Sequence, residues 1–116
     1  MSKSKRVGPV IFSVPAARTQ LLDHGEVFTY RSKDRTVGDT HARWGRTMPK
    51  GADVRIEKVC PINPQEKDAL RPYSALSGFG STEDWQEAIA ALYDRDEPPT
   101  HGYLYRVTLV QELYRP

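Results

Sequence analysis

The chain has a single cysteine, Cys60, among its 116 residues. One cysteine cannot form a disulfide within the chain, and it cannot supply a zinc site built from several cysteines. A lone thiol is typical of proteins in a reducing compartment, so we expect a cytoplasmic protein. Cysteine chemistry therefore supports neither the fold nor a metal site.

Long apolar runs and metal-binding patterns are also missing. The mean hydropathy is −0.64, and no run approaches the ~18 apolar residues that a membrane span needs. The short apolar stretch after the basic residues 1–6 is not followed by a small-residue cleavage pattern, so we expect neither a secretory signal nor a membrane partner. The three histidines, His24, His41 and His101, are scattered without carboxylates at ligand spacing. We therefore expect no metal and no cofactor.

Positive charge is concentrated in one segment of the chain. Residues 31–50 contain six cations and two acids, a net charge of +4, whereas the whole chain carries only +2. The cations are Arg31, Lys33, Arg35, Arg43, Arg46 and Lys50, and Trp44 lies among them. Fixed cations beside an aromatic ring suit a polyanion with flat bases, which predicts binding of RNA or another single-stranded nucleic acid. The alternative is a solvated loop, with Trp44 in the core.

Negative charge is concentrated further along. Residues 64–100 contain eight acids and three cations, a net charge of −5. A separate hypothesis follows from this segment: the protein is a small regulatory or interaction module that docks a basic partner through Glu83 to Glu97.

The hydrophobic pattern predicts one domain, residues 7–116, after a disordered basic tail of residues 1–6. The expected strands are Val7 to Val14, Val27 to Arg31, Ala52 to Ile62 and Tyr103 to Leu113, and the expected helices run from Pro15 to Gly25 and onward from Ser81. Residues 32–51 show little periodicity and are expected to form a long loop, with a short strand around residues 42–47 as an open alternative. These elements predict an α+β domain with a small β-barrel and two or three flanking helices.

Four short motifs occur in a characteristic order. They are the helix–Gly25–strand unit with Thr29 and Arg31, Lys50-Gly51 before a strand with Val54 and Ile56, Ser77-Gly78-Phe79-Gly80-Ser81 before a helix with Trp85, and the closing strand Tyr103 to Leu109. In this order they resemble the ASCH domain, a PUA-like fold, over roughly residues 7–113. The resemblance implies an RNA-related function and a cleft beside Thr29 and Arg31 that holds a nucleobase or nucleotide. The alternative for Arg31 is a structural ion pair with an acid such as Glu57.

Some ASCH domains are enzymes, including small amidohydrolases that act on N4-acetylcytidine. In these relatives a Lys, a Thr three residues later and a distant Glu carry the chemistry. Thr29 matches the Thr, but Glu26 stands at the Lys position and residues 74–81 contain no Glu. A Thr hydroxyl needs a base to become a nucleophile, and Glu26 cannot supply the cation that stabilises an oxyanion. We therefore expect a binding domain, with a hydrolase using Thr29, Glu26 and Lys33 as the alternative.

Overall fold

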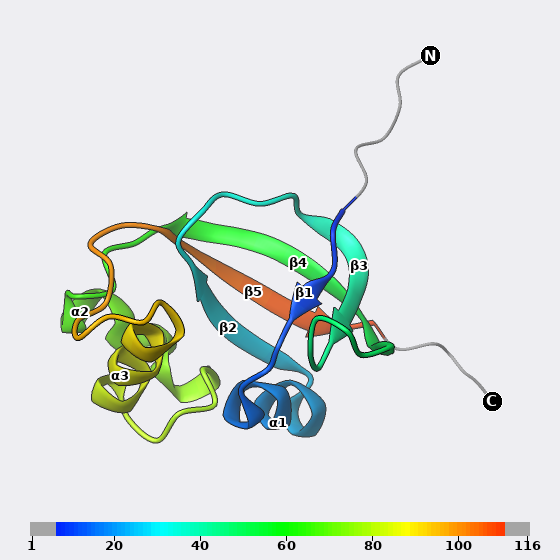
Figure 1. The fold of residues 1–116 in the computed structure, drawn as a ribbon, viewed down its shortest axis with the longest axis horizontal. Coiled ribbons are helices and arrows are strands. Elements are labelled where there is room, and N and C mark those ends of the chain that lie inside the picture. Colours follow the sequence, from blue (N-terminus) through cyan, green and yellow to red (C-terminus); the bar gives the residue numbers. More distant parts are fainter. Residues whose placement is uncertain (1–6, 111–116) are drawn as a thin grey trace, which may run out of the picture.

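The protein forms a five-stranded sheet, curled into a half barrel, with helices packed against it (Figure 1). The structure, a computed structural model, describes residues 7–110. The expected α+β class with flanking helices is thereby confirmed, and the sheet is a half barrel, which is compatible with the expected small barrel. The elements are β1 (Val10–Ile11), α1 (Pro15–His24), β2 (Glu26–Arg31), β3 (Gly38–Arg43), β4 (Lys50–Pro61), α2 (Lys67–Leu70), the 3₁₀ helix η1 (Arg71–Leu76), α3 (Thr82–Leu92) and β5 (Tyr103–Leu109).

The strands follow the order β1-β3-β4-β5-β2, so β1 and β2 are the two edges of the sheet. Strand β1 runs parallel to β3, and the other neighbours are antiparallel. The curl brings the edges toward each other. There the Nη2 atom of Arg31 on β2 donates a hydrogen bond of 3.1 Å to the carbonyl oxygen of Ile11 on β1. A side chain, rather than a backbone ladder, thus connects the two edges.

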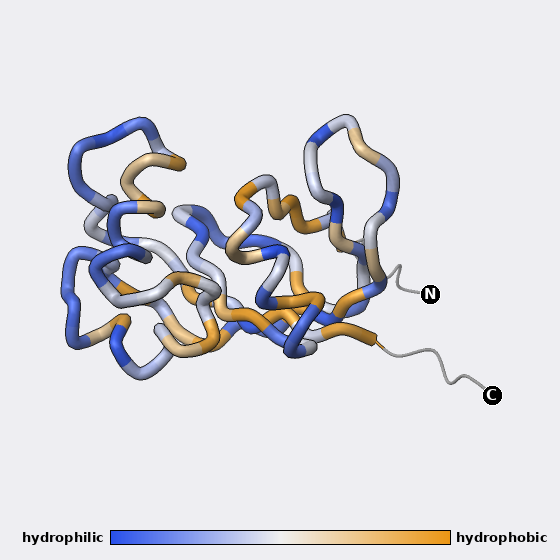
Figure 2. The backbone as a smooth tube through the Cα atoms, turned by 90° about the horizontal axis from the view of Figure 1, so that it is seen from below, coloured by the Kyte–Doolittle hydropathy of each residue, from blue (hydrophilic) through white to orange (hydrophobic). Residues whose placement is uncertain are grey.

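The inner face of the sheet is buried, and part of the outer face is buried against different helices. Inside the curl, residues from all five strands pack with Leu21 of α1. On the other face, Tyr30 and Leu104 pack with Leu70 of α2 and with Trp85 of α3. Successive residues of a strand point to opposite faces, which is why β2, β4 and β5 contribute to both cores. In Figure 2 the hydrophobic stretches accordingly gather in the strands and helices, and the hydrophilic ones in the outer loops.

The two long helices begin where the sequence predicts, and α1 also ends there. Pro15 occupies the first turn of α1, and Gly25 ends the helix with a φ of 82°. The Ser81 side chain caps α3 by accepting a hydrogen bond of 3.0 Å from the backbone N–H of Asp84. Asp84 also lies in the first turn of α3, where the helix dipole favours negative charge. Local chemistry therefore determines both helix starts.

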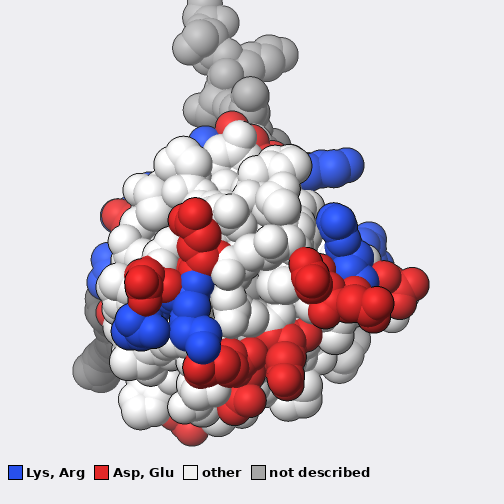
Figure 3. Space-filling model, turned by 90° about the vertical axis from the view of Figure 1, so that its left-hand side faces the viewer, with Lys and Arg blue, Asp and Glu red and all other residues white. Residues whose placement is uncertain are grey.

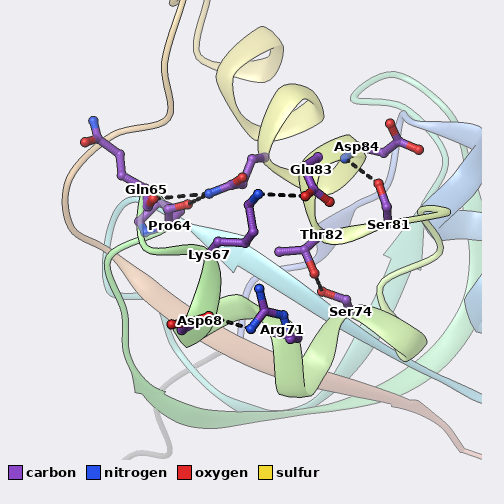
Figure 4. Close-up of polar contacts among 11 residues, drawn as sticks. Pro64, Gln65, Lys67, Asp68, Arg71, Ser74, Ser81, Thr82, Glu83 and Asp84 are labelled. Atoms are coloured by element: carbon purple, nitrogen blue, oxygen red, sulfur yellow. Dashed lines mark hydrogen bonds and ion pairs between the residues drawn. The ribbon is translucent and has the colours of Figure 1, made fainter.

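Polar contacts join α3 to the preceding segment (Figure 4). Lys67 of α2 forms an ion pair of 2.7 Å with Glu83, and the hydroxyls of Ser74 and Thr82 lie 2.7 Å apart. The Gln86 side chain donates a hydrogen bond of 3.0 Å to the carbonyl oxygen of Pro64. These contacts hold α2, η1 and α3 together as one cover over the outer face of the sheet.

Residues 32–51 differ most from the expected secondary structure. The predicted long loop contains β3, which lies a few residues before the alternative short strand and pairs with β4 along its length. The segment Gly-Asp-Thr-His-Ala-Arg has low strand propensity, so pairing with a neighbour decides its conformation. In contrast, β1 keeps only two residues of the expected Val7 to Val14 strand. The predicted basic tail, residues 1–6, and the end of the last expected strand lie outside the described residues.

Gly78 gives a direct test of the packing between α1 and the turn before α3. It has a φ of +93°, and a Cβ at this position would collide with the carbonyl oxygen of Ala16. We expect Gly78→Ala to lower the free energy of unfolding by about 1–3 kcal/mol from the backbone conformation alone, measured by urea denaturation. Gly8→Ala is the matched control, because a Cβ there meets nothing within 4 Å. Equal stability of the two variants would contradict this packing.

Candidate functional site

A cleft of about 550 Å³ opens where the two sheet edges approach each other. Its walls come from the β1–α1 connection, from β2, from the turn at residues 77–79 and from α3. The volume lies within the range of roughly 300–1,000 Å³ that is usual for small-molecule sites. Aromatic side chains dominate the lining: Phe12, Phe28, Tyr30, Phe79, Trp85 and Tyr93. The cleft therefore combines apolar walls with a small number of polar groups.

Arg31 is the charged group at the inner side of this cleft. Its Nη2 atom donates to the Ile11 carbonyl oxygen, and its guanidinium carbon lies 5.5 Å from the centre of the Phe12 ring. Its Nε atom is buried without a hydrogen-bond partner. Burial lowers the pKa of Arg31 from its ordinary value, because desolvation disfavours the charged form. Within residues 7–110, no carboxylate forms an ion pair with this guanidinium.

The suggested partner of Arg31 is engaged elsewhere. Glu57 forms an ion pair of 3.1 Å with Arg106, and Arg106 also forms a two-pronged contact with Glu26 at 3.1 and 3.2 Å. Arginine is charged at all physiological pH values, so an unpaired and desolvated arginine is unusual in a protein interior. The alternative of a structural Arg31–Glu57 ion pair is therefore wrong.

Thr29 and Glu26 lie on opposite faces of β2. Thr29 shares the face of Arg31 and lines the cleft, whereas Glu26 is three positions away and does not line it. The hydrogen bonds from Arg106 lower the pKa of Glu26. A carboxylate held in this way, on the other face, is not placed to take a proton from Thr29.

The predicted cations do not form a single surface. Arg46 lines the cleft together with Arg31. Lys33 is exposed just beyond the end of β2. Arg43 contacts the ring of His41 at 3.1 Å, and Lys50 forms an ion pair of 3.1 Å with Asp53.

Arg35 has a structural role. Its guanidinium donates to the carbonyl oxygens of Gly8, Pro9 and Thr36, the last at 2.9 Å. These contacts fasten the β2–β3 connection to the segment before β1. Of the six predicted cations, the structure thus brings two to the cleft and engages three in local contacts.

Trp44 lies outside the cleft lining and packs against the core inside the curl. The guanidinium carbon of Arg18 is 5.9 Å from its ring, and a Cβ on Gly51 would collide with the same ring. The aromatic groups of the cleft come instead from Phe12, Phe79 and Tyr93, which the charge pattern did not indicate. Among these three, Phe79 is the one that a sequence motif marks, because it stands between two glycines in the turn before α3.

A second, smaller groove has the opposite charge. It measures about 370 Å³ and lies along α3 and the loop that follows it, with Glu83, Glu87, Asp96 and Glu97 in its lining. Figure 3 shows acidic side chains around a largely uncharged surface at this end of the molecule, with Lys and Arg side chains beside them. The acids of residues 64–100 thus gather at one end, but they share it with basic groups such as Lys67.

Comparison with protein-family models, with curated proteins and with solved structures found no match to this chain. Within residues 7–110, no helix is long and apolar enough to span a membrane. The same part of the chain has no group of three or more His, Cys, Asp or Glu side chains that could hold a metal ion. The chemistry of the cleft is therefore the main guide to function.

Removing the Arg31 charge should leave stability almost unchanged. We expect Arg31→Met to change the free energy of unfolding by less than about 1 kcal/mol, because relief of a buried charge offsets the loss of one hydrogen bond. Arg35→Met is the matched control and should destabilise by roughly 1.5–3 kcal/mol, because it loses hydrogen bonds from a charged donor. Urea denaturation of both variants measures the difference. A larger loss for Arg31→Met would show that Arg31 is structural.

Tyr30, in the cleft wall, should lose its proton only at an unusually high pH. Burial of the hydroxyl and, to a smaller extent, the nearby Tyr93 raise its pKa to about 12. The hydroxyl donates a hydrogen bond to the His101 carbonyl oxygen. Since the folded-state pKa lies above the ordinary value near 10, the stability that this group contributes is complete below pH ~10 and is lost as the pH rises through about 12. The pKa values of Tyr73 and Tyr105 are raised as well, so the tyrosinate absorbance that appears at that pH should be smaller in Tyr30→Phe by the contribution of one tyrosine. An unchanged amplitude in the variant would contradict the assignment.

Proposed function

We propose that this protein is an ASCH-type, PUA-like domain that binds RNA or another single-stranded nucleic acid by holding one nucleotide in the cleft. The observation that supports this most strongly is Arg31, a half-buried cation whose Nε atom is enclosed without a partner and which has no acidic partner among the described residues, in the lining of an aromatic cleft. A buried unpaired charge is unfavourable unless a ligand compensates it. A nucleotide offers both an anion for the guanidinium and a flat base for the aromatic walls.

The aromatic walls suit a base. Phe28, Phe79 and Tyr93 are only half-buried and line the cleft from β2, from the turn at residues 77–79 and from the end of α3. Stacking of a base on an aromatic ring contributes roughly 1–3 kcal/mol and tolerates any base. We therefore propose a site that recognises a nucleotide without strong sequence preference.

The electrostatic part of the proposal rests on fewer cations than the sequence suggested. Arg31 and Arg46 line the cleft, and Lys33 is exposed beyond the end of β2. Arg35, Arg43 and Lys50 are engaged within the protein. With two or three phosphate contacts, the affinity for nucleic acid should depend only modestly on salt concentration, whereas six contacts would give a steep dependence.

The two alternatives have less support. A hydrolase would use Thr29, which lines the cleft, but the lining contains no carboxylate, imidazole or lysine that could act as its base. An interaction module would use the acidic groove beside α3, but Lys67 already neutralises Glu83 there. The binding cleft therefore remains the preferred proposal.

Arg31→Met tests the proposed function directly. We expect it to weaken binding of a fluorescent single-stranded RNA by roughly tenfold to a hundredfold, since hydrogen bonds to charged groups contribute about 1.5–3 kcal/mol. Fluorescence anisotropy at several salt concentrations gives the affinity. For two phosphate contacts, the logarithm of the association constant should fall with the logarithm of salt concentration at a slope of about −1.4.

Arg55→Ala is the control for net charge. Arg55 is exposed on β4, pairs with Asp39 at 2.8 Å and does not line the cleft. Its loss should leave the affinity nearly unchanged. An affinity that does not respond to salt, and that persists in Arg31→Met, would contradict the proposed function.

A further inference from the structure

The N-terminus of α1 lies beside Arg31 in the same cleft. Ser13, Val14 and Ala17 line the cleft from the start of this ten-residue helix. The N-cap residue, Val14, has no side chain that could accept a hydrogen bond from the first turn, and the first turn contains no acidic residue. Pro15 has no N–H, and the Arg18 N–H donates to the Val14 carbonyl oxygen at 3.3 Å. The N–H groups of Ala16 and Ala17 are thus the donors without a partner within the helix, and they carry partial positive charge. This end of α1 is therefore open to an anion.

Arg31 provides the independent second component of the site. Its guanidinium has five N–H donors, and only Nη2 has a hydrogen-bond partner among the described residues. Phe12 lies against the guanidinium, which directs a ligand to the edge of the guanidinium plane. That edge matches two oxygens of one phosphate group. The cation and the helix end thus line one cleft without a carboxylate between them.

We infer that Arg31 and the N-terminus of α1 form a subsite for a terminal phosphate, so that the cleft holds the phosphorylated end of a nucleic-acid strand. This inference rests on the proposed function. A terminal phosphate has one ester bond and three free oxygens, and it carries about −1.5 to −2 charges near neutral pH. An internal phosphodiester has two free oxygens, a single charge and a chain that continues on both sides.

The depth of the site favours a chain end over an internal phosphate. The Nε atom of Arg31 is enclosed by the protein, so a ligand reaches the guanidinium only through its Nη atoms at the inner side of the cleft, where a group that projects ahead of the rest of the ligand fits best. The first turn of α1 and the exposed Arg46 line the same cleft. One terminal phosphate offers enough oxygens for the guanidinium edge and the helix end together, whereas a phosphodiester uses two of its oxygens for the chain.

The test compares short single-stranded RNAs of one sequence that carry a 5′-phosphate, a 3′-phosphate or hydroxyls at both ends. We expect one phosphorylated end to bind at least about tenfold more tightly than the hydroxyl form, and the two phosphorylated forms identify which end is held. Equal affinities for all three, still weakened by Arg31→Met, would overturn the inference and leave the proposed function standing. Absence of affinity for all three would overturn both.

Ser13→Asp tests the helix end without weakening the helix. A carboxylate before the first turn occupies the anion subsite and favours the helix dipole, so the variant should keep its thermal stability and lose the preference for a phosphorylated end. Thr19→Asp, the same charge change at an exposed position of α1 outside the cleft lining, should keep that preference. A preference that survives in Ser13→Asp would show that the N-terminus of α1 takes no part in phosphate binding.

Discussion

The need to bury apolar side chains on both faces of one small sheet shapes the whole molecule. One face curls around an apolar core that α1 completes, and α2, η1 and α3 cover the apolar part of the other. A half barrel that curls this far brings its edge strands, β1 and β2, toward each other without joining them by backbone hydrogen bonds. The gap between the edges, together with the helices that flank it, produces the aromatic cleft. The cleft thus forms because the sheet packs one core inside its curl and another against the helices outside it.

Arg31 illustrates how a site departs from the rules that stabilise a fold. Buried polar groups are normally hydrogen-bonded, and buried charges are normally paired. Here Nε has no partner, whereas Arg106 satisfies two carboxylates and Arg35 contacts three carbonyl oxygens. Departures of this kind concentrate at functional sites, where stability is given up for ligand binding. This contrast among three arginines is the basis for proposing that Arg31 binds a ligand.

The positive segment of the sequence has several roles in the folded protein. Arg35 fastens a connection, Lys50 pairs with a neighbouring acid, and Arg31 reaches the cleft. Net charge along a chain describes the average field but does not say which side chains are free, because neutralising partners come from distant segments. Counting cations therefore overstates the number available for a polyanion. Function depends on the smaller set that the fold leaves without a partner.

Much of the fold follows from local sequence. Pro15, Gly25 and Ser81 determine helix ends through their own backbone and side-chain chemistry, and the alternation in β2, β4 and β5 predicts which residues face each core. Tertiary structure alone decided the rest. Strand β3 has little intrinsic preference and forms because β4 pairs with it. The cleft joins Phe12, Arg31 and Tyr93, which are far apart in sequence, so no local pattern could place them together.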